Sequence, residues 1–368
     1  MNDLRLKQLT LLNYRNIAEC TLEFSPKINC FLGNNGMGKT NLLDAIYYLS
    51  FCKSSLNSID SQIIKHHAEF FMLQGHYIRH ETEELIACSV QHGRKKQFSR
   101  NKKTYPRLIE HIGFVPLVML APDDIALIDD GSSERRRFLD MAIAQYSRPY
   151  MQALTTYNEV LLQRNALLRS DTEPDITMLD VLEERMSAEA TVIFEQRCHF
   201  INAFIPVFTQ FYEQIADRHE QVTLHYTSHL QQNDLQPLLR EVRQRDRIVG
   251  YTTRGIHKDE IEIAINEHPI KRTGSQGQNK SVVIAMKLAQ LVFLKRACNL
   301  TPILLLDDLF DKLDATRVQR IMDIVAGNDF GQIFITDTNR EHLDELIHKI
   351  DLHANIYNVI EGTVEEAK

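Results

Sequence analysis

The sequence contains no run of about 18 consecutive apolar residues, so we expect no helix to span a membrane. Its first segment, Met1 to Glu19, is interrupted by charged residues and lacks the apolar centre of a signal peptide. The six cysteines lie far apart and include no Cys-x-x-Cys pair, which argues against a disulfide framework and against a zinc site. These absences favour a cytoplasmic protein whose cysteines are reduced thiols.

Glycine and proline are scarce as well, with 14 and 10 residues among 368, which excludes collagen-like and low-complexity classes. No internal repeat with a period of about 20 to 50 residues is visible. The hydrophobic fraction of 43% excludes disorder as the main state. A chain of this length can form roughly two or three domains with a large buried core.

The net charge of −7 argues against a surface that coats nucleic acid over its whole area. One stretch departs from this average, because residues 94–107 hold seven basic residues and no acidic one. Such a stretch is either a solvated hairpin or a local surface that contacts phosphates. The candidates for DNA contact are Arg94, Lys95, Lys96, Arg100, Lys102 and Lys103.

Hydrophobic periodicity predicts an α/β core with an inserted helical segment. Residues 1–50 are typical of strand, turn, strand, glycine-rich loop and helix, and residues 68–100 of antiparallel strands. From residue 134 to 216 apolar residues recur at helical spacing, and a kink or a helix end is expected at Pro206. Strand character returns over residues 250–270, and a helix, a strand, a helix and a strand follow.

The most specific motif is the complete GxxxxGK[ST] loop Gly33-Asn-Asn-Gly-Met-Gly-Lys-Thr40. It stands between an expected strand and an expected helix, where backbone N–H groups and the helix N-terminus bind phosphates. Lys39 is expected to reach the β- and γ-phosphates and Thr40 to ligate Mg²⁺. We therefore expect ATP or GTP binding, in preference to a glycine-rich turn that opens an ordinary helix. The residues predicted to contact the nucleotide here are Gly33, Asn34, Asn35, Gly36, Met37, Gly38, Lys39, Thr40 and Asn41.

A second motif places two carboxylates at the end of an apolar strand, Pro302-Ile-Leu-Leu-Leu-Asp-Asp308. Open α/β sheets bind their ligands outside the carboxyl ends of the strands. Asp307 is expected to hold Mg²⁺, directly or through water, and Asp308 to orient or deprotonate the attacking water. The predicted catalytic residues are Asp308 and Lys39. The alternative is that the two acids cap the helix expected next.

A third segment, Thr273-Gly-Ser-Gln-Gly-Gln278, directly precedes an expected helix. Serine and glycine at a helix N-terminus can bind an anion. Because the phosphate-binding loop already holds one γ-phosphate, this second anion site suggests the nucleotide of a partner subunit. The alternative is a polar N-cap. A further acidic turn, which ends at Asp314, is expected at the same face as Asp307.

Taken together and in this order, five segments resemble the RecF family, which is related to the SMC-type and ABC-type ATPase heads. The matching segments run from about residue 5 to about residue 340 and include GNNGMGKTNLLDAIYYLS, GSSERRRFLDMAIAQYSRPYMQALTTYNEVLLQRNALLR, TRGIHKDEIEI, GSQGQNKSVVIAMKLAQ and ILLLDDLFDKLD. The second of these segments discriminates, because generic ABC heads lack it. The resemblance implies an ABC-type P-loop ATPase head with a mixed sheet, flanking helices and an antiparallel β meander, into which an α-helical lobe is inserted.

The resemblance also implies an ATP-dependent homodimer, in which Ser275, Gly277 and Gln278 of one subunit face the ATP of the other and Asp314 contributes to the same site. It implies binding of double-stranded DNA and of junctions between single- and double-stranded DNA. It further implies cooperation with RecR, and indirectly with RecO, in delivering RecA to single-stranded gaps during DNA repair, recombination, replication restart and the SOS response.

The sequence thus predicts an N-terminal head part over residues 1–130, a helical lobe over 131–248 and a C-terminal head part over 249–368. The leading hypothesis is an ATP-gated DNA clamp with Mg²⁺ and ATP as cofactors and with slow, DNA-stimulated ATP hydrolysis. The alternatives are a P-loop phosphotransferase and the ATPase subunit of an ABC transporter. No membrane contact is expected.

Overall fold

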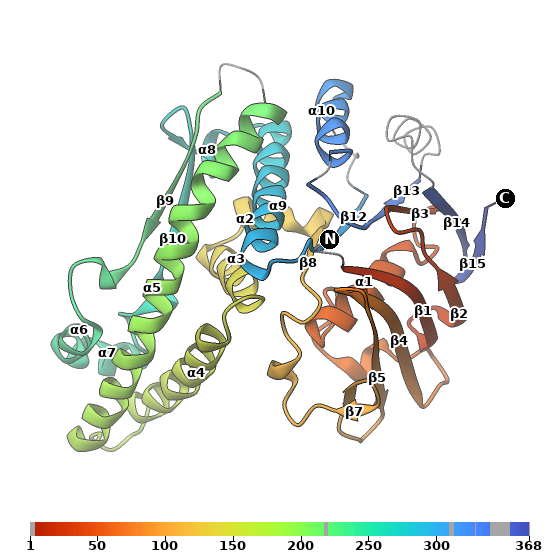
Figure 1. Ribbon diagram of the computed structural model, residues 1–368. Helices are drawn as coiled ribbons and strands as arrows, with labels where there is room; N and C mark the ends of the chain where they lie inside the picture. The colour runs from red at the N-terminus through yellow and green to blue at the C-terminus, as the bar shows by residue number, and fades with distance from the viewer. Residues whose placement is uncertain (1–3, 217–219, 309–312, 328, 339–353, 368) are drawn as a thin grey trace. The chain divides into compact units, whose positions relative to one another are not determined.

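The computed structural model describes residues 4–216, 220–308, 313–327, 329–338 and 354–367 (Figure 1). The chain divides into two compact units. The first unit comprises residues 1–124, 214–216 and 280–368, and the second comprises residues 125–213 and 217–279. The three-part domain division from the sequence stays a prediction. None of the helices in the described ranges is long and apolar enough to cross a membrane.

The first unit contains an antiparallel sheet of six strands in the order β2-β1-β4-β5-β6-β7. Buried and exposed residues alternate along its long strands, as they do in a sheet with one face on the core. The antiparallel strands predicted over residues 68–100 are therefore confirmed. The strand bounds are β1 Leu4–Tyr14, β2 Ile17–Glu23, β4 Phe70–Arg79, β5 Thr82–Gln91, β6 Gln97–Arg100 and β7 Lys103–Thr104.

The second sheet of this unit has the order β15-β14-β3-β13-β12-β8 and is parallel except for β15. Its interior strands β12 and β13 are buried along their whole length, as expected of a parallel sheet covered on both faces. The acidic pair Asp307–Asp308 therefore stands at the end of a buried strand. The strand bounds are β3 Ile28–Leu32, β8 Leu117–Leu120, β12 Ile303–Asp307, β13 Ile333–Asp337, β14 Ala354–Ile360 and β15 Thr363–Glu366.

Helix α1, Lys39–Phe51, contacts strands of both sheets and is buried over nearly its whole length. Helix α10, Ala315–Val325, begins at an N-cap provided by Asp314, whose carboxylate accepts a hydrogen bond from the backbone N–H of Arg317 at 2.9 Å. The long helix α9, Gln276–Cys298, begins in the second unit and continues into the first. Short 3₁₀ turns of this unit cover η1 Asp60–Ile63, η2 Leu108–Glu110 and η3 Pro122–Ile125.

The second unit is mainly helical, as predicted for residues 134–216, and it adds a three-stranded sheet in the order β11-β10-β9. Pro206 does not end the last of these helices, because α5 continues past it to Ile215. The helix bounds are α2 Ala126–Asp129, α3 Ser132–Ala144, α4 Arg148–Leu168, α5 Ile176–Ile215, α6 Leu235–Glu241, α7 Arg243–Val249 and α8 Ile270–Thr273. The remaining bounds are β9 Val222–Thr227, β10 Glu260–Ile265, β11 His268–Pro269, η4 His229–Gln231 and η5 Ile256–Lys258.

A buried ion network joins helices of the second unit. Arg164 on α4 is fully buried and donates to Glu183 on α5 and to Asp246 on α7, with N···O distances of 3.0 and 2.7 Å. Both carboxylates are fully buried as well. A buried charge that loses its partner is costly, so this network fixes how α4, α5 and α7 pack.

We expect Arg164→Met to lower the free energy of unfolding by about 3 to 5 kcal/mol, because it leaves the buried carboxylate of Asp246 without this cation and leaves Glu183 with Arg243 alone. Urea denaturation followed by circular dichroism measures this change. The control is Arg137→Met, which removes an exposed ion pair with Glu134 at 3.4 Å and should cost less than about 1 kcal/mol. Equal losses in the two variants would contradict the structural role of the buried network.

Candidate nucleotide site

The glycine-rich loop lies between β3 and α1, in the strand–loop–helix context that the motif requires. Gly38 adopts φ = 113°, a conformation that residues with a side chain rarely adopt, and it caps α1. A Cβ atom on Gly33 would lie 2.3 Å from the carbonyl oxygen of Val359, so β14 leaves no room for a side chain there. Glycine is therefore required at both ends of the loop.

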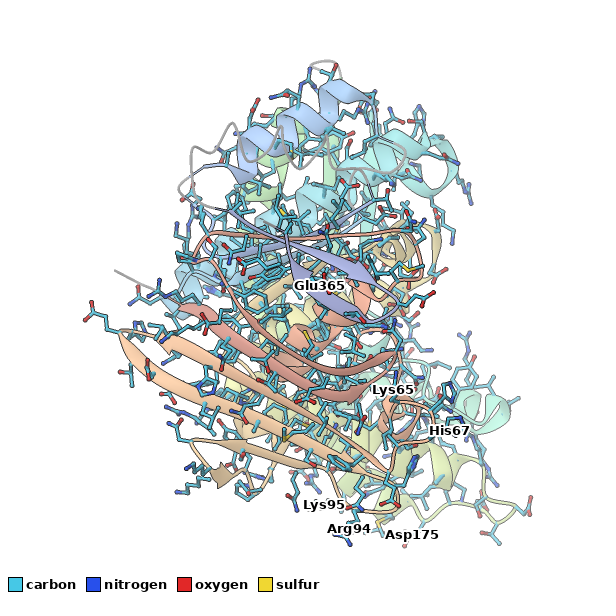
Figure 2. All side chains as sticks on the ribbon, turned by 90° about the vertical axis from the view of Figure 1, so that its right-hand side faces the viewer. Lys65, His67, Arg94, Lys95, Asp175 and Glu365 are labelled. Carbon is cyan, nitrogen blue, oxygen red and sulfur yellow. The ribbon has the colours of Figure 1, made fainter. Side chains whose placement is uncertain are left out.

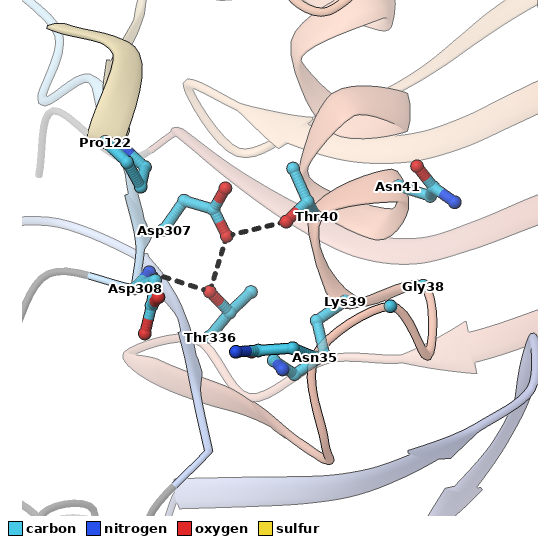
Figure 3. Close-up of a pocket in the computed structure, with 10 residues that line it drawn as sticks. Asn35, Gly38, Lys39, Thr40, Asn41, Pro122, Asp307, Asp308 and Thr336 are labelled. Carbon is cyan, nitrogen blue, oxygen red and sulfur yellow. Dashed lines mark hydrogen bonds between the residues drawn. The ribbon is translucent and has the colours of Figure 1, made fainter. Parts of the chain in front are cut away.

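A pocket of about 210 Å³ opens over this loop (Figure 3). All of its lining residues belong to the first unit: Asn35, Gly36, Gly38, Lys39, Thr40, Asn41, Pro122, Asp307, Asp308 and Thr336. The pocket therefore brings together the loop and the acidic pair, two motifs separated by more than half of the chain.

The acidic side of the pocket is organised around Asp307 (Figure 3). Its Oδ1 atom accepts hydrogen bonds from Thr40 Oγ1 at 3.1 Å and from Thr336 Oγ1 at 2.6 Å. The backbone N–H of Asp308 donates to the same Thr336 hydroxyl at 3.0 Å. Burial raises the pKa of the Asp307 carboxyl, and the hydrogen bonds from the two threonines partly offset this effect.

Lys39 is almost fully buried, and its ammonium donates to the loop's own carbonyl oxygens, Gly33 O at 2.7 Å and Asn34 O at 3.0 Å. Burial lowers the pKa of Lys39, whereas the nearby carboxylates of Asp308 and Asp307 raise it. The ammonium is thus held at the pocket by acceptors that a phosphate can replace.

The oxygen atoms of Thr40 and Asp307 are the hard ligands that Mg²⁺ prefers, and they already lie within hydrogen-bond distance of each other. Within the described part of the chain, no group of three or more His, Cys, Asp or Glu side chains could hold a metal ion by itself. The two residues therefore fit a cation that takes its other ligands from phosphate and water.

The outer side of the loop is held by residues that sequence reasoning missed. The carbonyl oxygen of Met37 accepts hydrogen bonds from Asn16 Nδ2 at 3.0 Å and from the backbone N–H of Gly362 at 2.9 Å. Asn16 Oδ1 accepts a further bond from Asn41 Nδ2 at 2.7 Å. No sequence motif marks Asn16 or Gly362. Each lies in a turn that is far from the phosphate-binding loop in sequence and reaches it only in the folded chain.

Ser275 and Gln278 form a reciprocal cap at the start of α9. Ser275 Oγ accepts from the backbone N–H of Gln278 at 3.2 Å, and Gln278 Oε1 accepts from the backbone N–H of Ser275 at 2.8 Å. Gln278 Nε2 also donates to Glu220 at 3.0 Å. Ser275, Gly277 and Gln278 belong to the second unit, and neither they nor Asp314 line the pocket. That these residues face the nucleotide of a partner subunit stays a prediction.

The basic stretch, residues 94–107, contains exposed side chains and side chains that form ion pairs with carboxylates. Arg94 and Lys95, in the turn between β5 and β6, point away from the sheet (Figure 2), and Lys102 and Lys103 are exposed. Lys96, in contrast, forms an ion pair with Asp60 at 2.6 Å. Arg100 pairs with Glu84 at 2.5 Å, which lowers the pKa of that carboxyl through the hydrogen bond. Four of the six DNA-contact candidates are thus free to meet a ligand.

Comparisons with known proteins agree with the resemblance found in the sequence. The AAA domain family matches residues 8–361. The DNA replication and repair protein RecF of Phocaeicola vulgatus is 53% identical over 365 residues, which cover 99% of this chain and 98% of the relative. The chain belongs to the RecF family. The RecF of Porphyromonas gingivalis is 46% identical and covers 98% of this chain and 99% of the relative.

The fold predicted from the sequence is also confirmed. A solved structure of the recombination mediator protein RecF with ATP, described as part of the RecFOR pathway, matches with a TM-score of 0.89 and 26% identity, covering 100% of this RecF-family chain and 98% of the other. An Smc head domain from Pyrococcus furiosus matches with a TM-score of 0.59 and 16% identity, covering 99% and 96%, and supports the fold alone. Both curated relatives are named as DNA replication and repair proteins.

We expect Asp307→Asn to be more stable than the wild type at alkaline pH and to lose this advantage as the pH falls through the raised pKa of Asp307. Because the pKa of Asp307 is raised in the folded state, its protonation favours folding, and this contribution is lost as the pH rises through the folded-state value. Asparagine stays neutral and can still accept the threonine hydrogen bonds. Melting temperatures across this pH range, without nucleotide, measure the difference.

The control for this experiment is Asp329→Asn, which removes a carboxylate that is 75% exposed and should not change the pH dependence. A variant at position 307 that is less stable than the wild type at every pH would contradict the assigned cost of burying the carboxylate.

Proposed function

We propose that this RecF-family protein is an ATP-dependent switch that binds DNA in repair and replication. The observation that carries the proposal is the convergence of Lys39, Thr40, Asp307 and Asp308 in one pocket. The named relatives, which are DNA replication and repair proteins, and the match to a RecF–ATP structure support it.

The phosphates of ATP bind to the backbone N–H groups of the loop and to the N-terminal end of α1. Lys39 exchanges the carbonyl oxygens of Gly33 and Asn34 for phosphate oxygens, which are stronger acceptors. Thr40 and Asp307 hold Mg²⁺, which neutralises phosphate charge when it is bound. Hydrolysis to ADP and phosphate is slow, and Asp308 orients or deprotonates the attacking water.

ATP binding closes a homodimer, in which the start of α9 in one subunit faces the nucleotide of the other. Ser275, Gly277 and Gln278 provide the contacts there, and Asp314 lies at the same interface. The exposure of Ser275 supports this role. Each additional 1.4 kcal/mol of preference for the closed state shifts the population about tenfold, so a few hydrogen bonds to the γ-phosphate suffice.

The DNA partner is a double strand or a junction between double- and single-stranded DNA, and the exposed candidates for its phosphates are Arg94, Lys95, Lys102 and Lys103. The solved relative is described as part of the RecFOR pathway. For this chain we propose RecR as the direct partner and RecO as an indirect one. The proposed outcome is the loading of RecA on single-stranded gaps. We also propose a cytoplasmic location and the domain bounds 1–130, 131–248 and 249–368.

We expect Lys39→Arg and Ser275→Arg both to abolish ATP-driven dimerisation while each monomer stays folded. Arginine at 39 is too large for the loop, whereas arginine at 275 obstructs the partner's nucleotide and leaves the subunit's own pocket intact. Sedimentation velocity with and without MgATP measures the dimer, and a fluorescent ATP analogue measures binding to the monomer. The control is Ser61→Arg at another exposed serine. ATP-driven dimers of normal stability in the Ser275 variant would overturn the two-subunit site.

The DNA surface is tested with the double variant Arg94→Gln, Lys95→Gln. Each lost phosphate contact should lower the slope of log affinity against log salt by about 0.9, so the slope should fall by about 2. Fluorescence anisotropy with a labelled junction in the presence of MgATP measures it. The matched control, Lys7→Gln with Arg296→Gln, removes the same charge from other exposed sites and should keep the wild-type slope. Identical slopes in all three proteins would place the DNA elsewhere.

A further inference from the structure

The loop between α1 and η1, residues 53–59, presents two large apolar side chains to solvent. Leu56 is 42% exposed and Ile59 is 49% exposed. Isolated apolar side chains are normal on a protein surface, whereas apolar side chains that gather in one place mark interaction sites. The whole loop belongs to the first unit, as do all the residues that hold it.

The backbone of this loop is fixed by hydrogen bonds that start from a buried carboxylate on α1. Asp44 is fully buried and accepts a hydrogen bond from Ser54 Oγ at 2.7 Å. Ser54 Oγ in turn accepts from the backbone N–H groups of Leu56 at 3.0 Å and of Asn57 at 3.1 Å. Asn57 Oδ1 accepts from the backbone N–H of Ile59 at 2.9 Å. The two apolar side chains are therefore exposed in fixed positions, which lowers the entropic cost of binding a ligand.

Lys96 joins this loop to the turn between β5 and β6. Its ammonium donates to the carbonyl oxygen of Cys52, which ends α1 immediately before the loop, at 2.7 Å. It also pairs with the carboxylate of Asp60, the first residue after the loop, at 2.6 Å. One side chain thus ties both ends of the loop to the turn that contains Arg94 and Lys95.

The surface made by the loop and this turn is basic around its apolar side chains. The loop contains no acidic residue, and the charge of Asp60 is offset by Lys96. Arg94 and Lys95 are exposed and point away from the sheet (Figure 2). Positive charge beside fixed apolar side chains suits a polyanion that also offers apolar faces. A nucleic acid with accessible bases has both properties.

The DNA that fits this surface is a junction rather than a continuous duplex. In a continuous duplex the bases are stacked on one another, and a protein meets only phosphates, sugars and the base edges in the grooves. Where one strand ends, the last base pair exposes its flat apolar face and the first unpaired bases can unstack. Leucine and isoleucine are among the side chains that proteins place against base faces, and basic residues hold the neighbouring phosphates.

We propose that Leu56 and Ile59 select junctions over continuous duplex by covering the base face that is exposed where one strand ends, while Arg94 and Lys95 bind the phosphates beside it. The inference rests on the proposed DNA binding and deepens it, because it names the residues that distinguish a junction from a plain duplex.

The test measures binding to two DNAs that differ only in a gap. Both are duplexes closed by a hairpin loop at each end, so that neither has a free end, and one of them carries an internal single-stranded gap. Fluorescence anisotropy with MgATP gives the affinity for each DNA. The variant Leu56→Ser with Ile59→Ser removes the apolar surface, whereas Leu56→Met with Ile59→Met keeps it. The matched control is Leu162→Ser with Ile176→Ser, at two other exposed positions.

We expect the wild type to bind the gapped DNA more tightly than the closed duplex. The double serine variant should lose about tenfold in affinity for the gapped DNA and stay within about twofold of the wild type on the closed duplex. Its slope of log affinity against log salt should not change, because no charge is removed. The double methionine variant and the control should keep the wild-type preference, and melting temperatures without DNA show whether each variant is folded.

A wild type that binds neither DNA would overturn the proposed function itself. If the wild type binds both DNAs and its preference for the gap is absent, or survives in the double serine variant, DNA binding stands and the role of Leu56 and Ile59 is wrong. An equal loss on both DNAs in the double serine variant would assign these side chains to the fold or to general DNA binding, and would also overturn the inference.

Discussion

The nucleotide pocket is organised around a buried carboxylate, Asp307, held between two threonine hydroxyls. Thr40 belongs to the first turn of α1 and Thr336 to β13, so the carboxylate at the end of β12 ties three elements of one sheet region together. Burial of a carboxylate is unfavourable, and its raised pKa expresses that cost. A cation bound at the same oxygen atoms would relieve this cost, as the proposed Mg²⁺ site requires.

The phosphate-binding loop shows how a local motif relies on distant support. Its eight residues specify a turn that presents N–H groups, yet its outer side is fixed by Asn16 from the β1–β2 turn and by Gly362 from the β14–β15 turn. Gly33 in turn packs directly against the backbone of β14 at Val359. The loop is thus preorganised by three parts of the chain before any phosphate binds, which lowers the entropic cost of binding.

The sequence predicts a feature well when neighbouring residues alone determine it. The loop, Asp307 and Asp308 were predictable, because a strand–loop–helix motif and an apolar strand ending in acids dictate their own placement. Asn16 and Gly362 were not, because hydrogen bonds between turns far apart in sequence leave no periodic signal. The ion pairs of Lys96 and Arg100 were not predictable either. A run of basic residues does not reveal that the carboxylates of Asp60 and Glu84 lie beside it in the folded chain.

The helical lobe illustrates a further limit. Helical spacing predicted its helices. Of the two outcomes expected at Pro206, a kink or a helix end, the end is excluded, because α5 continues to Ile215. Strand β9 pairs with β10 across a long sequence separation, and nothing local in its six residues announces that partner. Where the local preference for helix or strand is weak, or favours a different structure, tertiary contacts therefore determine which element forms.

The most direct test of the account is hydrogen exchange of two peptides, residues 33–41 and residues 275–279, as MgATP is added at low and at high protein concentration. The first peptide should be protected by MgATP at both concentrations, because the pocket lies within one subunit. The second should be protected only at the concentration at which dimers form. Protection of residues 275–279 in the monomer, or its absence when dimers are present, would contradict a nucleotide site shared between two subunits.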